Sequence, residues 1–103
     1  MSSWKTRVIE ALRRHVRGGT VRWTTKAVRE FTALSLTEPA AFEIVESLTV
    51  KNVVGRITSE TSGEELHVFK TLLDELSLYI KIAFRAECVV ISFHEDNGES
   101  RDE

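Results

Sequence analysis

The spacing of apolar side chains predicts a long helix at the start of the chain. Over residues 3–16, apolar positions recur every three or four residues, which places them on one face of a helix. Ser2 or Ser3 can cap this helix, because a serine hydroxyl accepts a hydrogen bond from the first unpaired backbone N–H groups. The pair Gly18-Gly19 then ends it, since glycine readily adopts the left-handed conformation found at helix C-termini.

The same spacing predicts two further, shorter helices. Residues 20–23 are rich in β-formers and make a short stretch that we expect at the edge of a sheet. Thr24 or Thr25 can cap the helix that follows over residues 25–34. The next helix begins at the cap Thr37, carries Pro39 in its first turn, where a missing N–H is harmless, and runs to about Leu48.

The second half of the chain changes to the alternating pattern of β-strands. Strands are predicted over residues 52–58, 66–71, 78–85 and 88–94, with turns at 61–63, 72–75 and 85–87. Residues 64–66 fit a helix equally well. Residues 78–85 alternate strictly, so that Tyr79 and Lys81 share one face of their strand. Residues 88–94 are nearly all apolar, which is typical of a central strand buried on both faces.

Three N-terminal helices followed by consecutive strands predict a single α+β domain over residues 1–96. We expect the helices to pack on one face of a small antiparallel sheet. A chain of 103 residues is close to the common size of one domain, and its hydrophobic fraction of 42% is too high for a disordered chain. Residues 97–103 are polar and acidic, and we expect this tail to be disordered.

The composition excludes several classes of protein. No apolar run is long enough to span a membrane or to act as a signal peptide, so we expect a soluble cytoplasmic protein. Cys88 is the one cysteine, and its apolar strand predicts a buried, inert thiol. His15, His67 and His94 are far apart in the sequence, so we expect neither a metal site nor a cofactor.

The charge is distributed unevenly along the chain, although the formal net charge is only −2. Residues 1–29 hold eight basic residues and one acidic residue, residues 30–94 hold five and ten, and residues 95–103 hold one and five. The basic first third suits an anionic partner such as a nucleic acid, and it equally suits a solvated helix whose polar face is rich in arginine. The residues expected to contact RNA are Arg13, Arg14, Arg17, Arg22 and Lys26.

The last two predicted strands can form a hairpin that gathers side chains able to cleave RNA. Tyr79, Lys81 and His94 would lie on one face, and Arg56 or His67 can join them from neighbouring strands. RNA cleavage without a metal needs a base for the 2′-hydroxyl proton, an acid for the leaving 5′-oxygen and cations beside the phosphate. A solvent-exposed sheet face also carries such residues for purely structural reasons. The face of the second strand that we expect beside Tyr79 carries Cys88, Val90, Ser92 and His94.

Several short motifs resemble those of the MqsR-type toxins, which are mRNA interferases of toxin–antitoxin modules. The similar motifs of the first half are Gly19-x-Val21-x-x-Thr24, Leu34-Ser-Leu36 and the helix-to-strand passage over residues 44–54. The last hairpin resembles the family's V-Y-L/I-K-I/L and V/L-I/V-I/V-S-F-K-E motifs, at residues 78–82 and 89–95. The resemblance extends over residues 12–95.

The resemblance implies a RelE/barnase-like fold, in which a twisted antiparallel sheet presents the active face. It implies catalytic roles for Tyr79 and Lys81, and it places His94 where the family has a lysine. A further lysine of the family aligns with Gly55 or, with a shift of one residue, with Arg56, and a glutamine of the family falls near His67. The implied activity is metal-independent cleavage of mRNA that leaves a cyclic phosphate and a 5′-hydroxyl, and the implied partner is a cognate antitoxin.

Two other functions stay open from the residues alone. The acidic residues of 38–103 suit a non-catalytic immunity or antitoxin-like protein that binds and neutralises a basic nuclease, because complementary charge speeds capture. The basic first helix also suits a small nucleic-acid-binding regulator. That role has only Trp4 and Trp23 as candidate aromatic contacts to bases.

Overall fold

A computed structural model describes residues 3–96, so the predicted acidic tail at residues 97–103 lies outside the described residues. The helices are α1 (Trp4–Gly18), α2 (Thr25–Ala33) and α3 (Glu38–Glu46), and a 3-10 turn, η1 (Val50–Asn52), follows them. The strands are β1 (Val21–Trp23), β2 (Val53–Thr58), β3 (Glu65–Leu73), β4 (Leu76–Phe84) and β5 (Cys88–Glu95). The predicted α+β class is confirmed, with every predicted helix and strand present.

Each helix begins at a hydroxyl residue, as the sequence predicts. The hydroxyl oxygens of Ser3, Thr24 and Thr37 accept hydrogen bonds from the backbone N–H three residues later, at 3.2, 3.0 and 3.3 Å. The first helix is capped at its C-terminal end by Gly19, whose φ of 72° lies in the left-handed region. Helix α3 ends at Glu46, two residues before the predicted Leu48.

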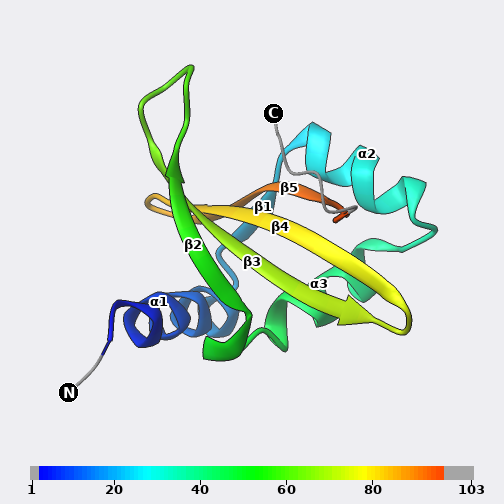
Figure 1. The fold of residues 1–103 in the computed structure, drawn as a ribbon, viewed down its shortest axis with the longest axis horizontal. Helices are drawn as coiled ribbons and strands as arrows, with labels where there is room; N and C mark the ends of the chain where they lie inside the picture. The colour runs from blue at the N-terminus through cyan, green and yellow to red at the C-terminus, as the bar shows by residue number, and fades with distance from the viewer. Residues whose placement is uncertain (1–2, 97–103) are drawn as a thin grey trace.

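The five strands form one sheet in the order β1-β5-β4-β3-β2 (Figure 1). Neighbouring strands are antiparallel except at one edge, where β1 runs parallel to β5. The parallel pair of β1 and β5 differs from the fully antiparallel sheet that the sequence predicts. It arises because β1 pairs with the last strand of the chain, with both later helices and three strands between them.

The hairpin between β3 and β4 is longer than the sequence predicts. Leu73 pairs with Leu76, so the predicted turn over residues 72–75 contracts to Asp74 and Glu75. Asp74 has a φ of 57°, a conformation that aspartate tolerates better than most residues. The longer hairpin brings Lys70 of β3 directly opposite Tyr79 of β4.

The helices cover one face of the sheet, as predicted, and build the hydrophobic core there. Figure 1 shows α1 and α3 below the sheet and α2 at its far end, beside β5. Helix α1 contributes Leu12 and α3 contributes Val45, and both side chains are fully buried with Phe69 and Ile80 of the sheet. Phe31 of α2 completes this layer beside β5.

A β-bulge in β5 decides which of its side chains face the core. Lys81 pairs with Ser92 but Ile82 pairs with Val90, so Ile91 has no partner in the ladder. The expectation that Cys88, Val90, Ser92 and His94 share one face is therefore wrong. Cys88 and Val90 face the helices, whereas Ser92 and His94 face the opposite side beside Lys81 and Tyr79. Burial raises the pKa of the Cys88 thiol to about 12, in keeping with the predicted inert thiol.

Candidate functional site

The face of the sheet away from α1 and α3 carries a cluster of polar side chains on three neighbouring strands. Tyr79 lies here because the side chains of a strand alternate, and its neighbours Leu78 and Ile80 are fully buried on the helix side. Tyr79 pairs across the ladders with Lys70 on one side and His94 on the other, and Lys81 pairs with Ser92. We call this cluster the Tyr79 face; its residues are Lys70, Tyr79, Lys81, Ser92 and His94.

Tyr79 is at the centre of the cluster. Its ring stacks on the imidazole of His94, with 5.1 Å between ring centres and an angle of 14° between the planes. The Nζ atoms of Lys70 and Lys81 lie 5.9 and 6.0 Å from the centre of the tyrosine ring. Two ammonium groups and an imidazole therefore lie around the ring of one phenol.

A hydrogen bond fixes the tautomer of the His94 ring. Nδ1 of His94 lies 2.9 Å from the backbone oxygen of Glu95. A carbonyl oxygen can only accept, so Nδ1 must carry the proton of this bond. The Nε2 atom of the neutral ring then has a free lone pair, which is what a general base requires.

Helix α2 adds a further cation to the rim of the Tyr79 face. Nζ of Lys26 donates to Ser92 Oγ at 2.9 Å and forms an ion pair with Glu30 Oε2 at 2.8 Å. The other carboxylate oxygen of Glu30 accepts from the backbone N–H of Phe93 at 2.8 Å. Glu30 thus contacts both the backbone of β5 and the lysine at the rim of the Tyr79 face.

Arg22 lies on the same side of the sheet as the Tyr79 face. Arg22 pairs with Val89 in the parallel ladder, and Val89 pairs with Ala83. Ala83 follows the core residue Ile82 along β4, so all three side chains lie on the face opposite to the helices. The guanidinium of Arg22 is exposed and forms an ion pair with Glu87 at 3.0 Å. Of the five residues predicted to contact RNA, the structure therefore places Arg22 and Lys26 on this side.

The sequence alone does not point to Lys70, although the structure places it beside Tyr79. Its Nζ atom lies 3.2 Å from Oδ2 of Asp96, a carboxylate with an exposed side-chain fraction of only 11%. The register that sets Lys70 opposite Tyr79 follows from a two-residue turn. The acidic pair Asp74 and Glu75 is the sequence feature that could have indicated this turn, since aspartate favours such positions.

Arg56 and His67 do not join the Tyr79 face, so this expectation is wrong. His67 pairs with Ile82 and Arg56 pairs with His67, which puts both side chains on the helix side of the sheet. The guanidinium carbon of Arg56 lies 4.5 Å from the centre of a Trp4 ring on α1. The His67 ring contacts Phe84 with 5.3 Å between centres. The alternation of side chains, which the strand register sets, separates the two groups.

The surroundings of His67 predict a stability that depends on pH. Burial lowers the pKa of His67 below its ordinary value of 6.5, and the charge of Arg56 acts in the same direction, against Glu65. Its Nδ1 atom is buried and has no hydrogen-bond partner within residues 3–96. In the unfolded chain, His67 therefore binds a proton at pH values where it is still neutral in the folded protein. This difference favours unfolding as the pH falls.

We expect the free energy of unfolding to fall as the pH drops from about 7.5 to about 5.5, with a smaller fall for His67→Gln. The measurement is urea unfolding at both pH values for the two proteins, because every other titrating group is common to them. An equal pH dependence in the two proteins would mean that His67 is protonated in the folded state as easily as in the unfolded chain.

The basic face of α1 lies on the opposite side of the sheet from the Tyr79 face. Arg14 and Arg17 are exposed on the outside of α1. Arg13 is used within the fold: its Nη1 and Nη2 atoms donate to the backbone oxygens of Glu46 and Leu48, both at 3.0 Å. A cation there satisfies carbonyl groups at the end of α3 and opposes the negative end of the helix dipole.

Replacing Arg13 with alanine should lower the free energy of unfolding by about 1–2 kcal/mol, because two hydrogen bonds to the end of α3 are lost. The matched control is Arg14→Ala, which removes an exposed guanidinium from the same helix and should change the value by less than about 0.5 kcal/mol. Urea unfolding of both variants gives the comparison. Equal losses would show that the contacts of Arg13 with α3 do not stabilise the fold.

Two further features bear on the site. Among residues 3–96, no group of three or more His, Cys, Asp and Glu side chains lies close enough to hold a metal ion. Within the same range, no helix is both long and apolar enough to cross a membrane.

The sequence pattern of a known protein family, described as the motility quorum-sensing regulator, toxin of MqsA, matches residues 6–95. The chain belongs to the MqsR toxin family. This confirms the resemblance seen in the motifs of the sequence. A member of this family is a toxin of a toxin–antitoxin module, and its partner is an antitoxin. No curated protein sequence matches this MqsR-family chain.

Proposed function

We propose that this MqsR-family toxin is a metal-independent endoribonuclease that cleaves mRNA at the Tyr79 face. The observation that carries the proposal is the stacking of Tyr79 on His94, with the ammonium groups of Lys70 and Lys81 lying 5.9 and 6.0 Å from the centre of the tyrosine ring. The set holds a base, a second proton-carrying group and two cations, which is what transesterification of RNA requires. The match to the toxin family favours this function over the antitoxin-like alternative.

In the proposed reaction, Nε2 of His94 removes the proton of a ribose 2′-hydroxyl. The 2′-oxygen then forms a bond to the adjacent phosphorus atom, and the bond from phosphorus to the 5′-oxygen breaks. The Tyr79 hydroxyl donates a proton to the departing 5′-oxygen, and Lys70 and Lys81 stabilise the extra negative charge of the phosphorane. The products are a 2′,3′-cyclic phosphate and a free 5′-hydroxyl.

The proposal also assigns the contacts to the RNA backbone. Lys26 and Arg22 lie on the side of the Tyr79 face, so they are the cations that we expect to bind the neighbouring phosphates. Arg14 and Arg17 lie behind the sheet and are too far around the molecule to bind the same short stretch. Arg13 contacts the end of α3.

The double variant Arg22→Ala with Lys26→Ala should weaken the binding of a short RNA and reduce the dependence of its affinity on salt. The matched control is Arg14→Ala with Arg17→Ala, which removes the same amount of charge from the far side. Fluorescence anisotropy with a labelled RNA over a range of salt concentrations measures both variants. A larger loss in the control would assign the RNA-binding surface to α1.

The test of the activity is incubation of the purified toxin with an end-labelled transcript in EDTA. The expected result is cleavage at discrete positions, with products that carry a cyclic phosphate and a 5′-hydroxyl. An RNA with a single 2′-deoxynucleotide at the cleaved position should resist cleavage there. A folded protein that leaves the transcript intact over a range of pH, or that cleaves only when magnesium is added, would overturn the proposal.

A further inference from the structure

Within residues 3–96, the outer edge of the sheet at β1 carries backbone groups that no other strand pairs with. The backbone oxygen of Thr20 accepts from Cys88 N–H at 2.9 Å, and Thr24 N–H donates to Val90 O at 3.1 Å. Backbone groups of successive residues point to opposite sides of a strand. The N–H and C=O groups of Val21 and Trp23 therefore point away from β5, toward the open edge, where another strand can pair with them.

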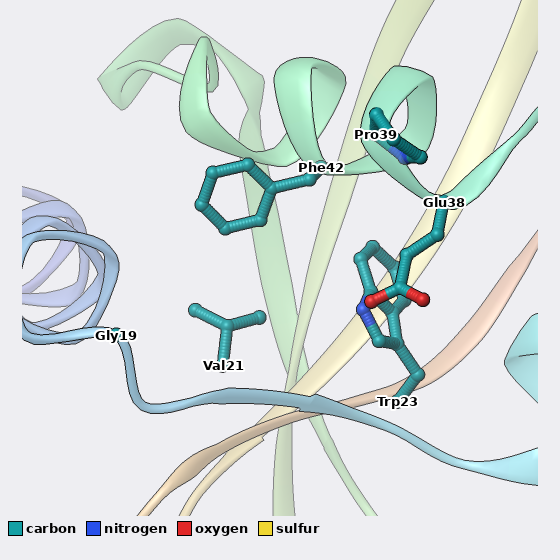
Figure 2. A pocket seen from close by; sticks show the side chains of 6 residues that line it. All are labelled: Gly19, Val21, Trp23, Glu38, Pro39 and Phe42. Carbon is teal, nitrogen blue, oxygen red and sulfur yellow. The ribbon is translucent and has the colours of Figure 1, made fainter.

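An apolar groove lies directly beside this edge, between β1 and the start of α3 (Figure 2). Its volume is about 350 Å³, and it is open to solvent. The side chains that make it apolar are Val21 and Trp23 of β1 and Pro39 and Phe42 of α3. Val21, Trp23 and Phe42 are only half-buried, so a side chain from another molecule can reach them.

The groove has an acidic group at one end. Figure 2 shows the Glu38 carboxylate over Trp23, whereas Gly19 marks the other end, beyond Val21. Glu38 is exposed and makes no ion pair with another residue in the range 3–96. A carboxylate in this position attracts a lysine or arginine side chain and repels the phosphates of RNA.

We propose that the β1 edge binds an extended segment of a partner protein as an added strand. The segment places an aliphatic side chain between Val21 and Phe42, and a lysine or arginine two residues along the segment reaches Glu38. Side chains two residues apart on a strand lie about 6.6 Å apart on the same face, which fits a groove that runs alongside β1. Backbone hydrogen bonds supply affinity in this mode, and the pocket for alternate side chains supplies specificity.

The proposal does not rest on ribonuclease activity, because the groove lies on the helix side of the sheet and involves none of the residues of the Tyr79 face. A protein that binds no peptide at β1 would not contradict the proposed cleavage reaction, and a protein that cleaves no RNA would not contradict peptide binding at β1. A protein segment fits better than RNA, since the edge offers alternating backbone donors and acceptors beside an acidic residue.

The test uses synthetic hexapeptides, acetyl-Thr-Thr-Ile-Thr-Lys-Thr-amide and the same residues in reverse order, added to the full chain labelled with ¹⁵N. The amide resonances of Val21 and Trp23 should shift most, and their exchange with solvent should slow. Replacing the peptide lysine with glutamate should weaken binding about three- to fivefold, as expected for an exposed ion pair. In the Glu38→Lys variant, the preference should reverse.

A pair of variants at Val21 separates the added strand from simple contact with the groove. Val21→Pro removes the outward N–H together with the valine side chain, while the ladder to β5, which uses the neighbouring residues, is kept. Val21→Ala shortens the same side chain and keeps the N–H, so peptide binding should be lost in Val21→Pro and only weakened in Val21→Ala, with both proteins folded. Absence of shifts at millimolar peptide, or equal shifts at the opposite sheet edge in β2, would overturn the proposal. Shifts that follow protein concentration without peptide would assign the edge to a second copy of the chain, and displacement by an RNA oligonucleotide would assign it to RNA; both also overturn it.

Discussion

The His94→Gln variant should cleave RNA about 10²- to 10⁴-fold more slowly than the wild-type toxin, which is the usual effect of removing a general base. Glutamine has about the right size for the site, but it cannot take up the proton of a 2′-hydroxyl. His94 is half-exposed and contacts the fold through Tyr79 and the backbone of Glu95, so the loss should be one of rate and not of folding. The measurement is single-turnover cleavage of the end-labelled transcript in EDTA.

The control for this variant is His15→Gln. His15 lies on α1, on the far side of the sheet, where its Nδ1 atom bonds to Thr20 Oγ1 at 2.7 Å. The His15→Gln variant should cleave RNA at the wild-type rate, because the side chain of residue 15 does not reach the Tyr79 face. Equal rates for wild type and His94→Gln, with both proteins folded by circular dichroism, would remove His94 from the mechanism. The loss of cleavage in both histidine variants would point instead to a general effect on the fold.

Truncating Phe93 to alanine should lower the free energy of unfolding by about 3–5 kcal/mol, the range observed for large aromatic side chains in protein cores. Phe93 is fully buried where α2 meets β5. Its ring centre lies 6.0 Å from that of Phe31 and 6.3 Å from that of Trp23, with tilted or edge-on rings. The cavity would open between these rings and remove contacts from both α2 and β1. Since small domains are stable by only about 5–15 kcal/mol, the variant should be marginally folded.

The comparison for Phe93→Ala is Phe42→Ala, which removes the same atoms from a half-buried position on α3. Guanidinium chloride unfolding should show a clearly smaller loss for Phe42→Ala, because less apolar surface leaves the core. A milder variant, Phe93→Leu, keeps most of the buried volume and provides a soluble protein if the alanine variant does not fold. Similar losses at both phenylalanines would mean that the rings around Phe93 close over the cavity.

Local sequence determined which segments are helices and which are strands. Each helix begins at a hydroxyl residue whose side chain caps it, and a glycine with positive φ caps the end of α1. These choices depend on residues within one helical turn, so they can be seen without the fold. The strict alternation around Tyr79 likewise places Leu78 and Ile80 in the core and Tyr79 and Lys81 outside it. Short motifs in both halves of the chain, most clearly those of the last hairpin, also indicated the family.

Tertiary structure decided which of the charged side chains come together. The face of a residue depends on strand register, and a bulge of a single residue at Ile91 reverses the faces of β5 on either side of it. The same dependence puts Arg56 and His67 under α1 and sets Lys70 beside Tyr79. Contacts between distant segments also make β1 parallel to β5. They likewise bring the Arg13 guanidinium within hydrogen-bond distance of the end of α3, more than thirty residues away in the sequence. The spacing of apolar and polar residues shows only which side chains of one strand or helix lie on the same face. Strand register and strand pairing depend on contacts between segments far apart in the chain.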